Sequence, residues 1–78
     1  MWVYLLRSVK SRERMYVGIT ADIDRRVAEH NAGKSDSTYR FRPWKCEVKM
    51  WFEDPEKARR FESYLKSGSG RTFSKRHF

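Results

Sequence analysis

The chain has 78 residues, enough for one domain with a small core, and only 38% of them are hydrophobic. Its formal net charge of +8 favours a polyanionic partner, with nucleic acid ahead of a membrane surface. A single cysteine, Cys46, excludes a disulfide framework, and the apolar N-terminal run is too short to span a membrane. We therefore expect a cytoplasmic protein with no membrane and no disulfide-linked partner.

Two short strands are expected at the start of the chain. Residues 2–9 (WVYLLRSV) and 15–20 (MYVGIT) are rich in aromatic and aliphatic side chains. The polar residues 11–14 leave room only for a short connection, which favours antiparallel pairing. The sequence thus predicts a hairpin.

A helix is predicted to follow, because the hydrophobic period changes after Thr20. Ile23 and Val27 lie four residues apart, with Ala28 beside them. Asp22 is placed to cap the helix and Gly33 to end it. Residues 34–43 are then a polar and basic loop.

Alternation is clearest in residues 44–52 (WKCEVKMWF), which predict a third strand. One face is apolar and comprises Trp44, Cys46, Val48, Met50 and Phe52. The other face is mostly charged, which is typical of a sheet covered on one side. Trp51 lies on that charged face, where it either packs beneath a helix or stacks on an unpaired base.

Residues 54–68 predict a second helix, with Asp54 as its cap and Gly68 as its end. Its buried stripe comprises Ala58, Phe61 and Leu65. Phe73 offers a docking point for a short final helix. The expected fold is α/β, a small three-stranded antiparallel sheet flanked by two or three helices, in one domain spanning residues 1–78.

Four side chains are candidates for chemistry, although each has an ordinary structural explanation when taken alone. Tyr4 and Tyr16 suit half-buried positions in a sheet. Arg26 suits a solvated helix face, and Glu62 suits a solvated or salt-bridged position beside the buried stripe. Only the combination favours a catalytic site.

That combination resembles the GIY-YIG nuclease superfamily over essentially the whole chain. The segments that carry the resemblance are WVYLL (2–6), YVGIT (16–20), DIDRRVAEHN (22–31) and FESYLKSGSGRTF (61–73). They are most similar to small stand-alone bacterial members related to the nuclease domain of the excision-repair incision subunit. The resemblance implies an endonuclease and a role in DNA repair.

The same resemblance implies residue roles. Tyr4 matches the tyrosine of the first half-motif, and Tyr16 that of the second, where it would orient or deprotonate the attacking water. Arg26 would bind the phosphate, and Glu62 would hold one Mg²⁺ or Mn²⁺ ion. His30 matches a histidine found after the helical arginine in many relatives, with a catalytic role and a structural or phosphate-contacting role both open.

The sequence departs from the family pattern at three points. Trp2 stands where the first half-motif has glycine, Val17 replaces isoleucine, and residues 63–78 contain no asparagine. The Val17 replacement is a harmless change in volume and branching, and the other two departures leave alternatives open. The alternatives are a catalytically inactive nucleic-acid-binding module of the same fold and a small basic interaction protein.

Basic residues in loops and at helix ends are expected to follow the backbone of a nucleic acid, DNA in the first place. They are Lys34, Arg40, Arg42, Lys66, Arg71, Lys75 and Arg76.

Overall fold

The computed structural model describes every residue from Met1 to Phe78. Its elements in chain order are β1 (Trp2–Ser8), β2 (Met15–Thr20), α1 (Ile23–Asn31), β3 (Trp44–Trp51), α2 (Pro55–Lys66) and α3 (Gly68–His77), with one 3₁₀ turn at Tyr39–Phe41. The three strands form one antiparallel sheet in the order β2-β1-β3. The predicted α/β class, sheet and helices are confirmed.

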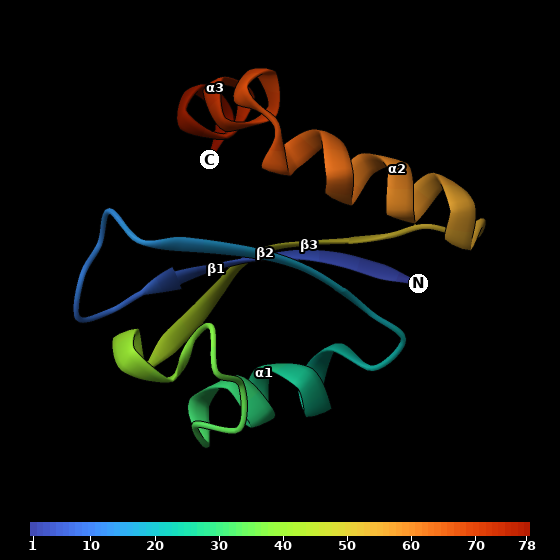
Figure 1. The fold of residues 1–78 in the computed structure, drawn as a ribbon. Coiled ribbons are helices and arrows are strands. Elements are labelled where there is room, and N and C mark those ends of the chain that lie inside the picture. The colour runs from blue at the N-terminus through green and yellow to red at the C-terminus, as the bar shows by residue number, and fades with distance from the viewer.

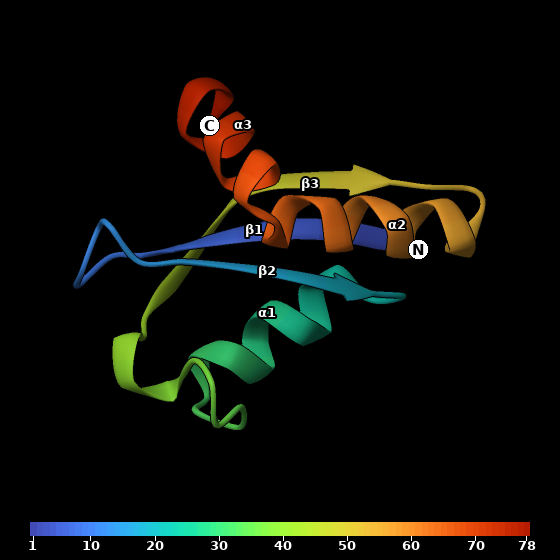
Figure 2. The same ribbon diagram turned by 45° about the horizontal axis from the view of Figure 1, so that its top comes forward.

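Helices cover both faces of the sheet. Figure 1 shows α1 beneath the sheet and α2 with α3 above it, and Figure 2 shows the same layers after rotation. On the α1 side, Tyr4, Leu6, Ile23 and Trp44 form one buried cluster. On the α2 side, a second cluster is built around Val3, Ala58 and Leu65. The prediction of a sheet covered on one side is therefore wrong.

A β-bulge in β3 explains this difference. Leu5 pairs with Val48 whereas the next residue, Leu6, pairs with Cys46, so β3 carries one extra residue at this point. Cross-strand partners share a face of the sheet. Val48 therefore faces α2, while Cys46 faces α1. The single apolar row predicted for this strand serves both cores.

Trp51 does not pack beneath a helix, contrary to one of the two positions predicted for it. It is 53% exposed, and its ring contacts that of Trp2 edge-on at a centroid distance of 5.3 Å. Trp2, which replaces the glycine of the first half-motif, thus packs toward β3. Its neighbour Tyr4 is opposite Gly18 of the other strand, β2.

The predicted helix caps are confirmed at the N-terminal ends. Asp22 accepts a hydrogen bond from the backbone N–H of Arg25, and Asp54 accepts one from that of Glu56. Gly33, with φ +78°, follows α1 in the left-handed conformation that ends helices.

Two details of the helices differ from the prediction. The inward face of α1 is formed by Ile23, Val27 and His30, whereas Ala28 is exposed. Ser67 rather than Gly68 ends α2, and the Ser67 hydroxyl also caps α3 by accepting a hydrogen bond from the Gly70 N–H. None of the three helices is long and apolar enough to cross a membrane.

Candidate active site

Tyr4 occupies the centre of the sheet, and its ring passes over Gly18 of β2. The residue is only 1% exposed. A Cβ atom at position 18 would collide with the ring and hydroxyl of Tyr4. The glycine of the second half-motif therefore makes the space that the tyrosine of the first half-motif occupies.

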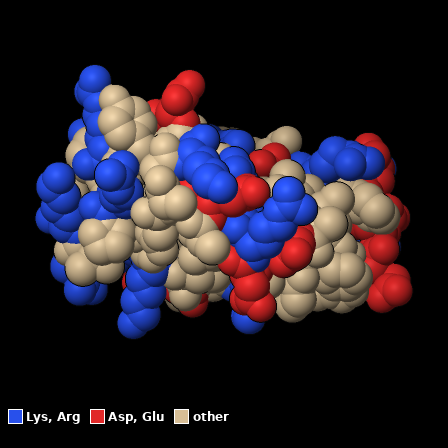
Figure 3. All heavy atoms as spheres, turned by 90° about the horizontal axis from the view of Figure 1, so that it is seen from below, with Lys and Arg blue, Asp and Glu red and all other residues tan.

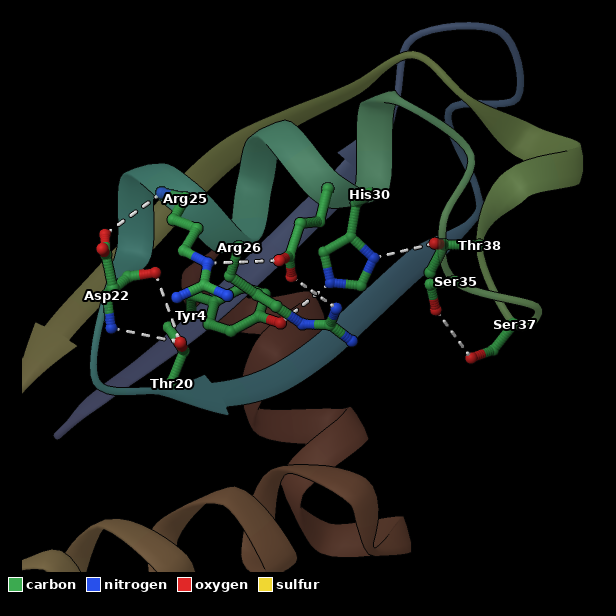
Figure 4. A network of polar contacts seen from close by, with 10 residues as sticks. Tyr4, Thr20, Asp22, Arg25, Arg26, His30, Ser35, Ser37 and Thr38 are labelled. Carbon is green, nitrogen blue, oxygen red and sulfur yellow. Dashed lines mark hydrogen bonds and ion pairs between the residues drawn. The ribbon is translucent and has the colours of Figure 1, made fainter.

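His30 links Tyr4 to the loop that follows α1. The imidazole is fully buried, with Nε2 2.9 Å from the Tyr4 hydroxyl and Nδ1 2.8 Å from the Thr38 hydroxyl. Figure 4 shows this ring between the two partners. A neutral imidazole has one donor and one acceptor nitrogen, so both contacts can form without a charge. Burial, assisted by the positive charge of Arg26, lowers the pKa of His30 and keeps it neutral.

The Tyr4 hydroxyl is also held in its neutral form. Burial, together with the nearby Tyr16, raises the pKa of Tyr4 to about 12, although Arg26 acts in the opposite direction. The negative charge of Glu62 makes a further contribution to this rise. Groups from α1 and α2 therefore act on one hydroxyl of β1.

Tyr16 lies at the edge of the sheet, because β2 is an outer strand. Its ring centroid is 4.9 Å from that of His30 and 6.3 Å from that of Tyr4. Unlike these two neighbours it is only half-buried, and it lines a surface hollow. Of the three, Tyr16 is the one that solvent reaches.

Arg26 and Arg25 differ in their surroundings although they are adjacent. The Arg26 side chain is 33% exposed and its Nη1 lies 3.1 Å from Glu29 Oε1. This hydrogen bond raises the pKa of Arg26. The Arg25 side chain is 76% exposed and contacts the same carboxylate at 3.3 Å. Figure 4 shows Arg26 beside Tyr4, with Arg25 nearer the start of α1.

Glu62 approaches the site from α2. Its side chain is only 18% exposed, and Oε2 lies 3.2 Å from Lys66 Nζ. No group of three or more His, Cys, Asp or Glu side chains exists that could hold a metal ion without other ligands. A single carboxylate fits Mg²⁺ or Mn²⁺, because such hard ions take their remaining ligands from water and substrate phosphate. Glu62 is therefore chemically suited to one ion.

The predicted nucleic-acid-binding residues fall into separate groups. Lys66, Arg71 and Lys75 line one hollow together with Tyr16. Lys34, Arg40 and Arg42 are exposed in the loop between α1 and β3. Arg76 is exposed in α3, next to His77, which lines a different hollow with β3.

Three further residues belong to this arrangement but were missed from the sequence. Thr38 holds His30, Glu29 holds Arg26, and Arg14 lines the hollow beside Tyr16. The spacing of three residues between Arg26 and Glu29 could have indicated an ion pair on a helix. No sequence signal marks Thr38, which lies in a polar loop.

Comparison with protein families matches residues 1–76 to the GIY-YIG catalytic domain. Neither the curated proteins nor the solved structures searched gave a match. The family match spans nearly the whole chain and includes Tyr4, Tyr16, Arg26, His30 and Glu62. The chain therefore belongs to the GIY-YIG catalytic domain family, which implies a metal-dependent nuclease.

Proposed function

We propose that this protein is a divalent-metal-dependent endonuclease that hydrolyses phosphodiester bonds in DNA. One observation supports the proposal: Tyr16 of β2, Arg26 of α1 and Glu62 of α2 all influence the ionisation of the same Tyr4 hydroxyl, in a chain of the GIY-YIG family. The narrower relation to the excision-repair nuclease domain, and with it a role in DNA repair, remains a prediction.

Hydrolysis requires an oxygen of water to attack phosphorus while the bond to the leaving oxygen breaks. Tyr16 is the residue we assign to the attacking water: its hydroxyl orients that water and, when the hydroxyl is ionised, the phenolate oxygen accepts the proton of the water. Its half-buried position beside the hollow supports this role. Tyr4 suits it less well, because it is almost fully buried and its pKa is raised to about 12.

Tyr4 and His30 are assigned as positioning residues. Their hydrogen bond, continued to Thr38, joins β1, α1 and the following loop beneath Tyr16. The full burial of His30 supports positioning over direct contact with a phosphate.

Arg26 is assigned to bind the phosphate, because its guanidinium can donate two parallel hydrogen bonds to the phosphate oxygens. The Glu29 carboxylate holds that guanidinium at one side. Glu62 is assigned to one Mg²⁺ or Mn²⁺ ion, which when bound would neutralise charge on the phosphate and the leaving oxygen.

The test is cleavage of labelled flaps, branched duplexes, single strands and RNA, with Mg²⁺ or Mn²⁺ and with EDTA. Cleavage is expected only with metal, and Glu62→Gln should abolish it while leaving binding in EDTA within about twofold of wild type. Glu56→Gln is the matched control, because Glu56 lies on the same helix and pairs with an arginine at 3.4 Å.

Wild-type cleavage by Glu62→Gln at limiting Mg²⁺ would refute the metal assignment. Binding without cleavage by the wild-type protein would instead support the alternative, an inactive nucleic-acid-binding module.

A further inference from the structure

The largest hollow on the molecule adjoins the candidate active site, on the face of the sheet covered by α2 and α3. Its volume is about 590 Å³. It is lined by Glu13, Arg14, Met15, Tyr16, Val17, Leu65, Lys66, Arg71 and Lys75. Four of these side chains are cationic and one is anionic, so the hollow favours an anion.

The hollow also has an apolar part. Met15 and Val17 come from β2, and Leu65 comes from α2. A phosphate alone has no apolar surface to bury against these side chains, whereas a nucleotide presents both an anionic phosphate and a flat apolar base. The volume lies within the range of about 300 to 1,000 Å³ that is typical of small-molecule sites.

Two lining residues connect the hollow to the site. Tyr16 borders the hollow at the sheet edge, while its ring lies on the α1 face of the sheet, against His30. Lys66 borders it while its ammonium contacts the Glu62 carboxylate. A nucleotide in the hollow would therefore be a neighbour of the phosphodiester placed at Tyr16 and Glu62.

From this geometry we propose that the hollow binds one unpaired nucleotide of the DNA substrate, next to the bond that is cleaved. This inference rests on the proposed function and specifies its substrate as DNA with an unpaired nucleotide. The base lies against the half-buried Met15 and Val17, and Arg71 and Lys75 contact the backbone. A paired base remains within its duplex and cannot enter.

Binding in EDTA tests the proposal without requiring cleavage. The probes are a fully paired duplex and the same duplex with one bulged 2-aminopurine, whose fluorescence changes when it leaves the base stack. The wild-type protein should bind the bulged duplex about tenfold more tightly, which corresponds to the contact of one base with the protein. Equal affinities for the two duplexes would overturn the proposal, even if metal-dependent cleavage is observed.

Two variants locate the effect. Val17→Phe fills the apolar part of the hollow and should abolish the preference for the bulged duplex, while affinity for the paired duplex stays within about twofold. A preference that survives in folded Val17→Phe protein would overturn the proposal.

The second variant, Arg71→Gln/Lys75→Gln, does not alter the apolar part and therefore remains informative if Val17→Phe is unstable. Its control is Lys57→Gln/Arg60→Gln, which removes the same charge from exposed positions of α2 outside the hollow. The first pair should lower the affinity for the bulged duplex about tenfold more than the control. Equal losses would show that only net charge matters and would overturn the proposal.

Discussion

At the scale of single residues, the site depends on two tyrosines whose surroundings differ. Tyr4 is 1% exposed and bonded to His30, while Tyr16 is half-buried at the sheet edge. Removing the Tyr16 hydroxyl leaves its ring packed, so we expect Tyr16→Phe to slow cleavage about 10²-fold or more with little change in stability.

Tyr4→Phe provides the comparison. It leaves the buried Nε2 of His30 without its partner, so we expect it to lower the free energy of unfolding by about 1–3 kcal/mol. Single-turnover cleavage and urea unfolding of both variants measure the two effects. Unchanged cleavage by Tyr16→Phe would contradict its assignment to the attacking water.

Arg26 and Arg25 offer a second comparison within one helix. Arg26→Lys replaces a planar fork by a point charge, and we expect cleavage to fall about tenfold or more. Arg25→Lys should have a much smaller effect, since its side chain is 76% exposed. Equal cleavage rates for the two variants would show that the roles within the pair are misassigned.

Stability should also depend on pH through His30 and Tyr4, both of which the fold keeps neutral. The pKa of His30 is lower in the folded protein than in the unfolded chain. The contribution of His30 to the free energy of unfolding is therefore lost as pH falls below about 6.5. The pKa of Tyr4 is raised to about 12. The contribution of Tyr4 to the free energy of unfolding is therefore present below about pH 10 and is lost as pH rises toward about 12.

Urea unfolding from about pH 5 to pH 11 measures both limits. Tyr4→Phe is the control, because the difference between it and the wild-type protein isolates the alkaline loss due to Tyr4. A wild-type stability that is constant from about pH 5 to pH 7 would contradict the assignment of a buried neutral His30.

At the scale of elements, the junction of α2 and α3 positions the basic residues Lys66, Arg71 and Lys75 that line the hollow. Gly68 and Gly70 are both helical. A Cβ atom at Gly70 would collide with the Tyr64 carbonyl oxygen, whereas a Cβ atom at Gly68 would have no neighbouring atom within 4 Å. We expect Gly70→Ala to destabilise the protein by about 1–3 kcal/mol and Gly68→Ala to be neutral or stabilising. Thermal unfolding of the two variants measures this, and equal melting temperatures would contradict the close packing of the helices.

The third strand shows how much an element's sequence can predict. Its alternation correctly indicated a strand from residue 44, because side chains on a strand alternate with period two. It also indicated that all the apolar residues share a face. This second prediction fails because of the bulge in β3 between the partners of Leu5 and Leu6. One extra residue there moves the side chains on the two sides of the bulge to opposite faces of the sheet.

At the scale of the whole molecule, charge is distributed unevenly. On the face drawn in Figure 3, one end carries mostly Lys and Arg, the opposite edge carries Asp and Glu, and both kinds are mixed between them. The basic end corresponds to the β1–β2 turn and the loop before β3 in Figure 1, and the acidic end to the start of α2. This polarity favours a DNA path over the basic end.

We therefore expect DNA affinity to fall about 10²-fold between about 50 and 200 mM salt, as is typical when about four phosphates are contacted. Arg40→Gln/Arg42→Gln should reduce the slope of log affinity against log salt by about 0.9 per lost contact. Lys57→Gln/Arg60→Gln, on α2, should not. Fluorescence anisotropy in EDTA measures the slopes, and affinity independent of salt would contradict a polyanionic partner.

The sequence by itself determined the elements of this protein and the residue types of its candidate site. Helix caps at Asp22 and Asp54 and the stripe of Ala58, Phe61 and Leu65 depend on neighbours along the chain, so local patterns sufficed. The order of Tyr4, Tyr16, Arg26 and Glu62 likewise pointed to the GIY-YIG family, which the comparison shows.

Only the tertiary structure decided which side chains meet. Thr38 reaches His30 across a loop, and Tyr4 reaches over Gly18 because β1 and β2 pair in one particular register. Tertiary packing also decides which of the basic residues near the C-terminus line the hollow. Lys66, Arg71 and Lys75 line the hollow that Tyr16 borders, whereas Arg76, one residue after Lys75, does not. Adjacent residues on a helix point about 100° apart, so the side that each presents depends on how the helix packs.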